Sequence, residues 1–396
     1  MAQQHLDPPS DPTVDRTAGP SPKLSTAPPL STSLERGDPH EQAGAPTGDA
    51  LAEYLRAQAT EFLRALRQHR EAGEGGLPAR GKSRAGEGGG TEDSGDAALA
   101  LRRSARRISG TLHTFRALLD AEWSEAMRPE LAWLSGTLAR EHAYAARLDR
   151  LLLALHRLSG SSAFPTQTTG AAEGAGPRDR VGVPERGNLT VGAAKAGALL
   201  ERQLTLARTR AHSAALQALG SSRFHAVADS VAVLASEVPL TPAAATADLR
   251  PSAAAAEERL TDAVAALPLV TAGHPYNAEA LVHGLSPDPA PHPQDGPWHQ
   301  VRLLLRLHRY ALEVLQGRYG ENAAVDLRLL AAGQALDRHR DASEAAAAAA
   351  AAARTPRIAP ATAYALGVLH ADQRHEVEAA RFAFQQSWQK QAVGTP

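Results

Sequence analysis

Two stretches of sequence, LRRSARRIS from Leu101 and VRLLLRLHR from Val301, decide how this chain folds. Each carries arginine at its second and sixth positions: Arg102 and Arg106 in the first, Arg302 and Arg306 in the second. The spacing of four places the two arginines of each stretch on one face of a helix. The sequence therefore predicts two helices, about 200 residues apart, that each carry an arginine stripe.

A second pair of segments repeats at nearly the same offset. LAREHA begins at Leu138 and LDRHRD begins at Leu336, each at the equivalent place in a later helix. One short match would be chance, but two matches in register indicate an internal duplication. We therefore expect two pseudo-symmetric helical bundles.

Apolar spacing around these stretches is helical throughout. Leu101, Ala105 and Ile108 recur at intervals of three and four, whereas no segment alternates with period two. Aromatic residues make up only 4% of a chain rich in Ala, Leu and Arg, which favours helix over strand. The fold class is predicted to be all-α, with helices at about 49–71, 95–119, 129–158, 190–219, 221–236, 253–267, 298–317, 322–353 and 360–390.

Composition divides the chain into a tail and a helical region. Residues 1–46 are dense in Pro, Ser, Thr and Gly, so they are expected to be a disordered tail. Residues 47–391 form the predicted helical domain, with a first half at about 47–186 and a second half at about 187–391. Cysteine is absent, and no run of about 18 apolar residues occurs. We expect a cytoplasmic protein without a thiolate metal site, a cofactor or a membrane partner.

The arginine stripes are the main functional signal. In the second helix His299, Arg302, Arg306 and Arg309 project together, with Tyr310 beside them. In the first helix Arg103 and Arg107 flank the Arg102 and Arg106 stripe. A solvated surface face is the simpler interpretation of such a charge run. Recurrence in both halves and the use of arginine, whose planar fork suits phosphate oxygens, favour a basic groove that binds an anion.

At these residues the sequence resembles the CHAD domain (conserved histidine α-helical domain) family. The segment WHQVRLLLRLHRYALEVL, from Trp298, is similar to the family's V-H-x-x-R-x-x-x-R-R-x-R helix, and LDRHRD supplies the aspartate of a later family motif at Asp341. The resemblance implies paired helical bundles around a basic channel that binds inorganic polyphosphate, in bacteria at polyphosphate granules. The polyphosphate-binding residues that we expect are Arg102, Arg103, Arg106, Arg107, His299, Arg302, Arg306, Arg309, Tyr310 and His339.

Some positions depart from the family pattern. Leu99 and Ala143 replace polar residues in the first half, and Leu303 and Leu307 replace basic ones in the second. The alternative interpretation is therefore a CHAD-like scaffold that binds protein partners without a ligand. Because the second stripe is more complete, it is expected to contribute more to binding, and a phosphate bound to His299 would raise the pKa of that imidazole.

Other motifs do not indicate catalysis. GLPARGKS from Gly76 matches a phosphate-binding loop formally, but it lies in Gly-rich sequence with no strand before it. HADQRHE from His370 lacks the spacing of a zinc motif. Nucleic acid is a weaker candidate than polyphosphate, because the stripes lack interleaved aromatic residues that would stack on bases. The sequence therefore predicts binding without an enzymatic step, with protein partners at polyphosphate granules as a further expectation.

Overall fold

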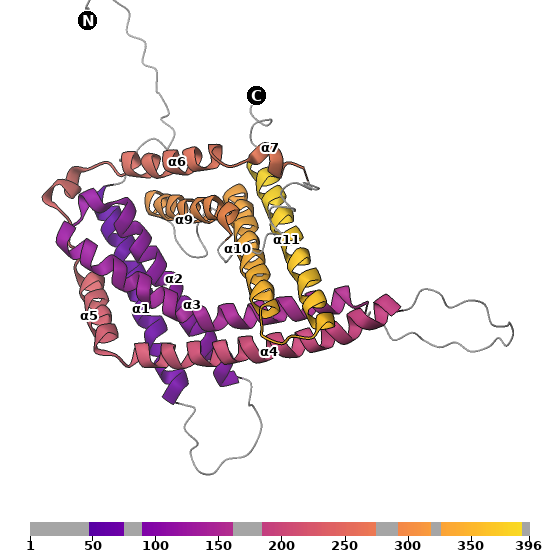
Figure 1. The fold of residues 1–396 in the computed structure, drawn as a ribbon. Coiled ribbons are helices and arrows are strands. Elements are labelled where there is room, and N and C mark those ends of the chain that lie inside the picture. The colour runs from indigo at the N-terminus through magenta and orange to yellow at the C-terminus, as the bar shows by residue number, and fades with distance from the viewer. Residues whose placement is uncertain (1–46, 75–88, 161–183, 275–291, 318–325, 390–396) are drawn as a thin grey trace, which may run out of the picture. The chain divides into compact units, whose positions relative to one another are not determined.

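The computed structural model describes residues 47–74, 89–160, 184–274, 292–317 and 326–389. These residues form α-helices joined by turns and short 3₁₀ segments, so the expected all-α fold is confirmed (Figure 1). In the described ranges the β structure is one isolated bridge, between Leu119 and Leu240. The helices are α1 (Gly48–Glu74), α2 (Gly89–Thr114), α3 (Ala121–Leu158), α4 (Pro184–Leu219), α5 (Ser222–Ser236), α6 (Arg250–Ala265), α7 (Leu269–Ala272), α9 (Gly296–Gln316), α10 (Leu327–Ala353) and α11 (Pro360–Gln389), with 3₁₀ segments at Arg116–Leu118, Pro242–Thr246 and Pro293–Asp295.

Some predictions concern residues outside these ranges. The expected tail at residues 1–46 and the GLPARGKS segment at 76–83 lie outside the described residues. None of the described helices is long and apolar enough to cross a membrane.

Helix α3 begins at Ala121 and not, as predicted, at Pro129. Asp120 is its N-cap residue, and the carboxylate of this side chain accepts a hydrogen bond from the backbone N–H of Trp123 at 2.8 Å. Proline is most common in the first turn of a helix, yet Pro129 lies inside this one. Burial of Ser124 and Met127 keeps the preceding turns helical.

The described helices pack around three hydrophobic cores. The first core joins α1, α2, α3 and α5 through residues such as Phe62, Ile108 and Leu134. The second core joins the later turns of α3 and α4 to α10 and α11. The third core lies among α6, α9, α10 and α11, where Trp298 and Phe384 are fully buried. Along each helix the buried residues of these cores recur at intervals of three and four, and this spacing is what predicted the helices from the sequence.

Helix α9 belongs to two of these cores. Near its start Trp298, Val301 and Leu305 pack in the third core, whereas Ala311 and Val314 pack in the first. Helix α9 therefore connects the first core to the third core.

The alanine run 345–353 completes α10. Ala345, Ala346, Ala349 and Ala352 are buried, and their small side chains let α10 and α11 lie side by side (Figure 1).

The division of the helical region at residue 187 stays a prediction. Helix α4 begins at Pro184 and packs along α3, and α5 packs on α1.

Candidate anion-binding site

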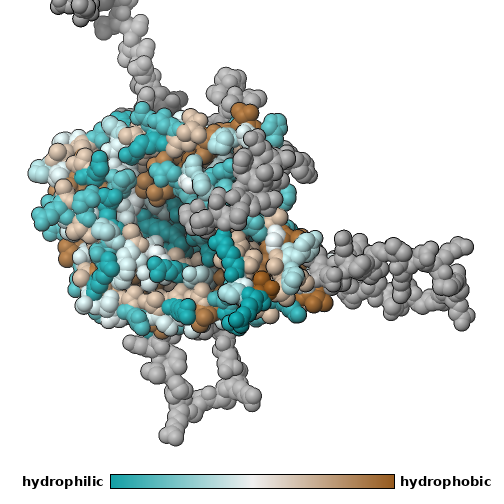
Figure 2. Space-filling model, in the orientation of Figure 1, coloured by the Kyte–Doolittle hydropathy of each residue, from teal (hydrophilic) through white to brown (hydrophobic). Residues whose placement is uncertain are grey.

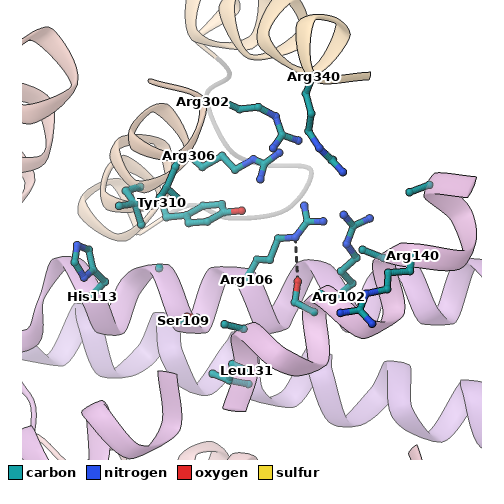
Figure 3. Close-up of a pocket in the computed structure, with 18 of the residues that line it drawn as sticks. Arg102, Arg106, Ser109, His113, Leu131, Arg140, Arg302, Arg306, Tyr310 and Arg340 are labelled. Carbon is teal, nitrogen blue, oxygen red and sulfur yellow. Dashed lines mark hydrogen bonds between the residues drawn. The ribbon is translucent and has the colours of Figure 1, made fainter. Parts of the chain in front are cut away.

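Four helices enclose a cavity of about 640 Å³. Helices α2 and α3 come from the first part of the chain and α9 and α10 from the second (Figure 3). Figure 2 shows a recess with hydrophilic side chains on this face of the protein. The cavity is lined by Arg102, Arg106, Ser109, Gly110, His113, Arg128, Leu131, Ala132, Ser135, Gly136, Ala139, Arg140, Ala143, Tyr144, Arg147, Arg302, Leu303, Arg306, Leu307, Tyr310, Arg340 and Glu344.

A second cavity of about 400 Å³ continues from the first. The two share arginines from all four helices, and the second adds Arg150, Asp337 and Asp341 to its lining. Together they form one cleft, which we call the arginine cleft.

Helical periodicity aims the stripes into this cleft. On α2, Leu101, Ala105 and Ile108 are fully buried in the first core, so the neighbouring Arg102 and Arg106 emerge beside that core. Figure 3 shows the guanidinium groups of Arg302 and Arg306 on α9 directed toward those of α2 from the opposite side. The two arginine pairs that indicated the duplication therefore face one cavity.

The larger cavity carries an excess of positive charge. Among the described residues its lining contains eight arginines and one carboxylate, that of Glu344. Glu344 pairs with Arg147 and also accepts a hydrogen bond from Nε of Arg340 at 2.7 Å. Because the cleft is walled by protein, these charges are screened less than they would be on an open surface.

The α9 pair has a carboxylate partner of its own. Oδ1 of Asp337 accepts hydrogen bonds from Nε of Arg302 and, at 3.1 Å, from an Nη atom of Arg306. Although burial raises the pKa of Asp337, the charges of Arg302 and Arg306 bring it below its ordinary value. An anion that binds Arg302 and Arg306 must therefore compete with Asp337.

The α2 pair lacks such compensation within the described residues. Nε of Arg106 donates to Oγ of Ser135 at 3.2 Å, and the buried Nε of Arg102 has no hydrogen-bond partner. Burial and the neighbouring arginines lower the pKa of Arg102 to about 10 and that of Arg106 to about 9. Both side chains are charged at neutral pH and lack a counter-ion, which is the state that an anion would stabilise.

The structure places five of the ten predicted residues in the cleft and five elsewhere. Arg102, Arg106, Arg302, Arg306 and Tyr310 line it. Outside it are Arg103, Arg107, His299, Arg309 and His339. Whether any of the ten binds a ligand stays a prediction, but the geometry separates the two groups.

The other arginines of the stripes point in other directions. Arg103 and Arg107 line a separate cavity between α1 and α2. Nε of Arg107 donates to Glu313 at 2.8 Å, and its guanidinium lies over the ring of Tyr310. Arg309 lies beside Gly333 of α10.

The two histidines lie behind the α9 stripe, in a buried polar network. His339 stacks on Trp298, and its Nε2 accepts a hydrogen bond from Nε of Arg381 at 3.3 Å. Asp295, which precedes α9, binds both Arg381 and Arg374 at 2.7 Å. These contacts hold the start of α9 against α11.

Burial determines the protonation of these histidines. It lowers the pKa of His339 to about 4 and also lowers the pKa of His299, whose Nε2 lies 3.4 Å from Oγ of Ser343. Both imidazoles are therefore neutral at pH 7 in the ligand-free protein. Neither ring lines the cleft in the ligand-free protein, and a contact of either ring with a ligand stays a prediction.

The sequence interpretation missed four arginines of the cavity. Arg128, Arg140 and Arg147 come from α3, and Arg340 comes from α10. Arg140 and Arg147 are seven residues apart, which places them on one face of α3. That spacing was the available signal. Arg140 and Arg340 also lie in the repeated segments LAREHA and LDRHRD, but only the arginine pairs of the stripes were interpreted as binding residues.

These observations define an all-helical protein with an arginine cleft between helices from the two ends of its sequence. A family profile described as "CHAD domain" matches residues 79–350. The solved structure of PptA from Streptomyces chartreusis is similar, with 68% identity and a TM-score of 0.68, over 87% of this chain and 100% of that chain. The chain therefore belongs to the CHAD domain family.

A second solved structure is more distant. The CHAD domain from the plant Ricinus communis aligns at 17% identity and a TM-score of 0.46, over 89% of this chain and 93% of that chain. A search of curated proteins found no match.

Proposed function

We propose that this protein binds inorganic polyphosphate in the arginine cleft and does not hydrolyse it. Membership of the CHAD domain family supports this ligand, because polyphosphate is what the resemblance implies. Residence in the cytoplasm and association with polyphosphate granules and their proteins belong to the same proposal.

The observation that carries the proposal is the charge of the larger cavity. Eight arginines from four helices face one carboxylate there, and a chain of phosphates supplies repeated negative charge along its length. Guanidinium groups bind phosphate oxygens through paired, charge-assisted hydrogen bonds. A linear polyanion can therefore contact several of these side chains at once.

Calorimetric titration with a long polyphosphate chain tests this proposal. Arg102→Gln with Arg106→Gln removes the two cavity arginines of α2, neither of which forms an ion pair with a described residue. We expect affinity to fall about a hundredfold, or about tenfold for each charged contact. Arg56→Gln with Arg67→Gln is the matched control, because it removes equal charge from the exposed face of α1. Equal losses in both variants would show that binding depends on overall charge and not on the cleft.

The same titration ranks the two stripes. The more complete stripe on α9 predicts that Arg302 and Arg306 contribute more to binding. The ion pairs predict the reverse, because Arg302 and Arg306 already share the carboxylate of Asp337 and must exchange it for the ligand. We expect Arg302→Gln with Arg306→Gln to weaken binding less than the α2 double variant. Asp337→Asn should raise the affinity of the otherwise unchanged protein several-fold and reduce the difference between the two double variants. A larger loss from the α9 pair in both backgrounds would favour the ranking by sequence.

Catalysis is tested separately. Phosphate release from polyphosphate should remain at the level of buffer, with and without Mg²⁺, at protein concentrations that saturate binding. Steady release of phosphate would contradict a role limited to binding. No detectable polyphosphate binding would favour the alternative, a CHAD-like scaffold for protein partners.

A further inference from the structure

The two ends of the larger cavity differ in chemistry. At one end Arg102, Arg140, Arg302 and Arg340 converge (Figure 3). The lining also includes four apolar or aromatic side chains, which together we call the apolar end: Leu131, Leu303, Leu307 and Tyr310. A ligand made of charge alone gains nothing from the apolar end, because phosphate oxygens placed against leucine side chains lose hydration without replacement.

The apolar end is built from side chains on two helices. Leu303, Leu307 and Tyr310 are spaced by four and three residues, so they form one row on α9 next to the row of Arg302 and Arg306. Leu303 is 50% exposed, an unusual position for a leucine beside so many charges. Across the cavity Gly136 of α3 leaves space, since a Cβ there would meet no atom within 4 Å.

Two polar groups at this end, His113 and Ser109, are uncharged, and the nearby Arg128 forms an ion pair with Glu125. Burial and then the charge of Arg128 lower the pKa of His113, so its imidazole is neutral at pH 7. Its buried Nδ1 has no hydrogen-bond partner among the described residues. The hydroxyl of Ser109, which also lines the cavity, can donate to or accept from a polar atom of an organic group.

We propose that the cavity accepts organic polyphosphates, that is, a di- or triphosphate esterified to an apolar or aromatic group. The phosphates bind the converging arginines, and the organic group lies against Leu303, Leu307 and Tyr310. This inference rests on the proposed polyphosphate site and names a second ligand class for it. A cavity of about 640 Å³ is within the usual size range for small-molecule sites.

Competition with a labelled polyphosphate chain, without divalent cations, tests the inference. Adenosine triphosphate is compared with tripolyphosphate, and geranyl diphosphate with pyrophosphate. Each ester has one ionisable oxygen fewer than its inorganic counterpart, so electrostatics alone predicts that the ester binds no more tightly. We expect at least one ester to bind about fivefold more tightly than its counterpart, because its organic group buries apolar surface. The ester that does so tells whether the site prefers an aromatic or an aliphatic group.

Two variants locate the effect. Leu303→Ser should remove most of the advantage of the ester, measured as the ratio of its affinity to that of its inorganic counterpart, and Leu303→Lys should in addition strengthen inorganic binding. Leu206→Ser, at an equally exposed leucine of α4, is the matched control and should change neither. If tripolyphosphate binds and both esters bind more weakly than their counterparts, this inference fails and the polyphosphate proposal stands. If the labelled chain binds but none of the four compounds displaces it, this inference fails and the polyphosphate proposal stands. If the labelled chain itself does not bind, both fail.

Discussion

Arg106 shows how single residues hold the arginine cleft ready for an anion. Its guanidinium is largely buried, and Arg102 and Arg306 add repulsion, so its pKa falls to about 9. Tyr310 and Arg302 also act on it, the tyrosine raising its pKa and the arginine lowering it further. The folded protein thus carries the charge at a cost in stability, and a bound anion relieves that cost.

This environment predicts an unusual pH dependence of binding. A polyanion favours the protonated guanidinium, so the pKa of Arg106 is higher in the complex than in the free protein. Affinity is then highest at pH values below about 9, the pKa of Arg106 in the free protein, and decreases as pH rises through that value. Between pH 7 and 8 we expect constant affinity, since burial already keeps His113, His299 and His339 neutral there.

Titrations of a long polyphosphate chain from pH 6 to 10.5, with circular dichroism to confirm folding, measure this dependence. In the variant Arg102→Gln with Arg106→Gln, polyphosphate affinity should decrease much less above pH 9 than in the unchanged protein. A fall centred near pH 6.5 that disappears in His299→Ala would show instead that this histidine binds the phosphate directly.

Residue types and spacing predict part of this site. The repeated arginine pairs were found from sequence, because a four-residue spacing on a helix defines a face. His299 and His339 were interpreted as phosphate contacts because they belong to the same motifs. Sequence does not show burial, and in the structure His339 is buried against Trp298 and Arg381, outside the lining of the cleft.

At the level of helices, α9 has the greatest influence on the cleft. It carries Arg302 and Arg306 and is fixed at its far end by Glu313. Oε2 of Glu313 accepts hydrogen bonds from the hydroxyl of Tyr54 on α1 and from Nε of Arg107 on α2, both at 2.8 Å. Burial and the Glu313 charge raise the pKa of Tyr54, and the hydrogen bond to Glu313 raises that of Arg107 although burial opposes it.

Removal of this carboxylate tests its role. Glu313→Gln leaves Arg107 without its counter-ion and weakens the bond from Tyr54, so the free energy of unfolding should fall by about 1–3 kcal/mol. Chemical denaturation measures this change. Glu61→Gln, which breaks the exposed pair with Arg64, is the control and should have little effect. A similar small effect at Glu313 would mean that apolar packing alone positions α9.

Helix boundaries show what apolar spacing predicts and what it leaves out. The region from α9 to α11 was located within a few residues, except that α10 begins at Leu327 rather than near residue 322. The start of α3 was missed, because an interior proline is indistinguishable from a first-turn proline until the capping of Asp120 is seen. The short helix α7 was also missed, since four residues carry no periodicity.

At the level of the whole molecule, salt acts on the cleft in two opposite ways. Screening weakens the mutual repulsion of the arginines and so stabilises the ligand-free fold. The same salt competes with the displacement of counter-ions by which a polyanion binds. The two effects have one origin and can be separated by measuring stability and affinity on the same protein.

We expect the melting temperature of the ligand-free protein to rise between 50 and 200 mM salt, while polyphosphate affinity falls roughly 10²- to 10⁴-fold. Saturating polyphosphate at low salt should also raise the melting temperature. Thermal denaturation and titration at matched salt concentrations measure both. In the variant Arg102→Gln with Arg106→Gln, salt should raise the melting temperature less and should lower the polyphosphate affinity less than in the unchanged protein. A melting temperature that falls with salt would show that ion pairs, not repulsion, dominate the cleft.

The arrangement of the three cores has a consequence for the order of folding. The first core draws mainly on residues of α1, α2, α3 and α5, and the third on residues of α6, α9, α10 and α11. The second core, by contrast, joins residues of α3 and α4 to residues about 140 to 220 positions later in α10 and α11. Loop-closure entropy makes such distant contacts form late. We therefore expect the docking of α2 and α3 against α9 and α10 to come late in folding. Because arginines face each other across the cleft, a polyanion present during folding should accelerate this step.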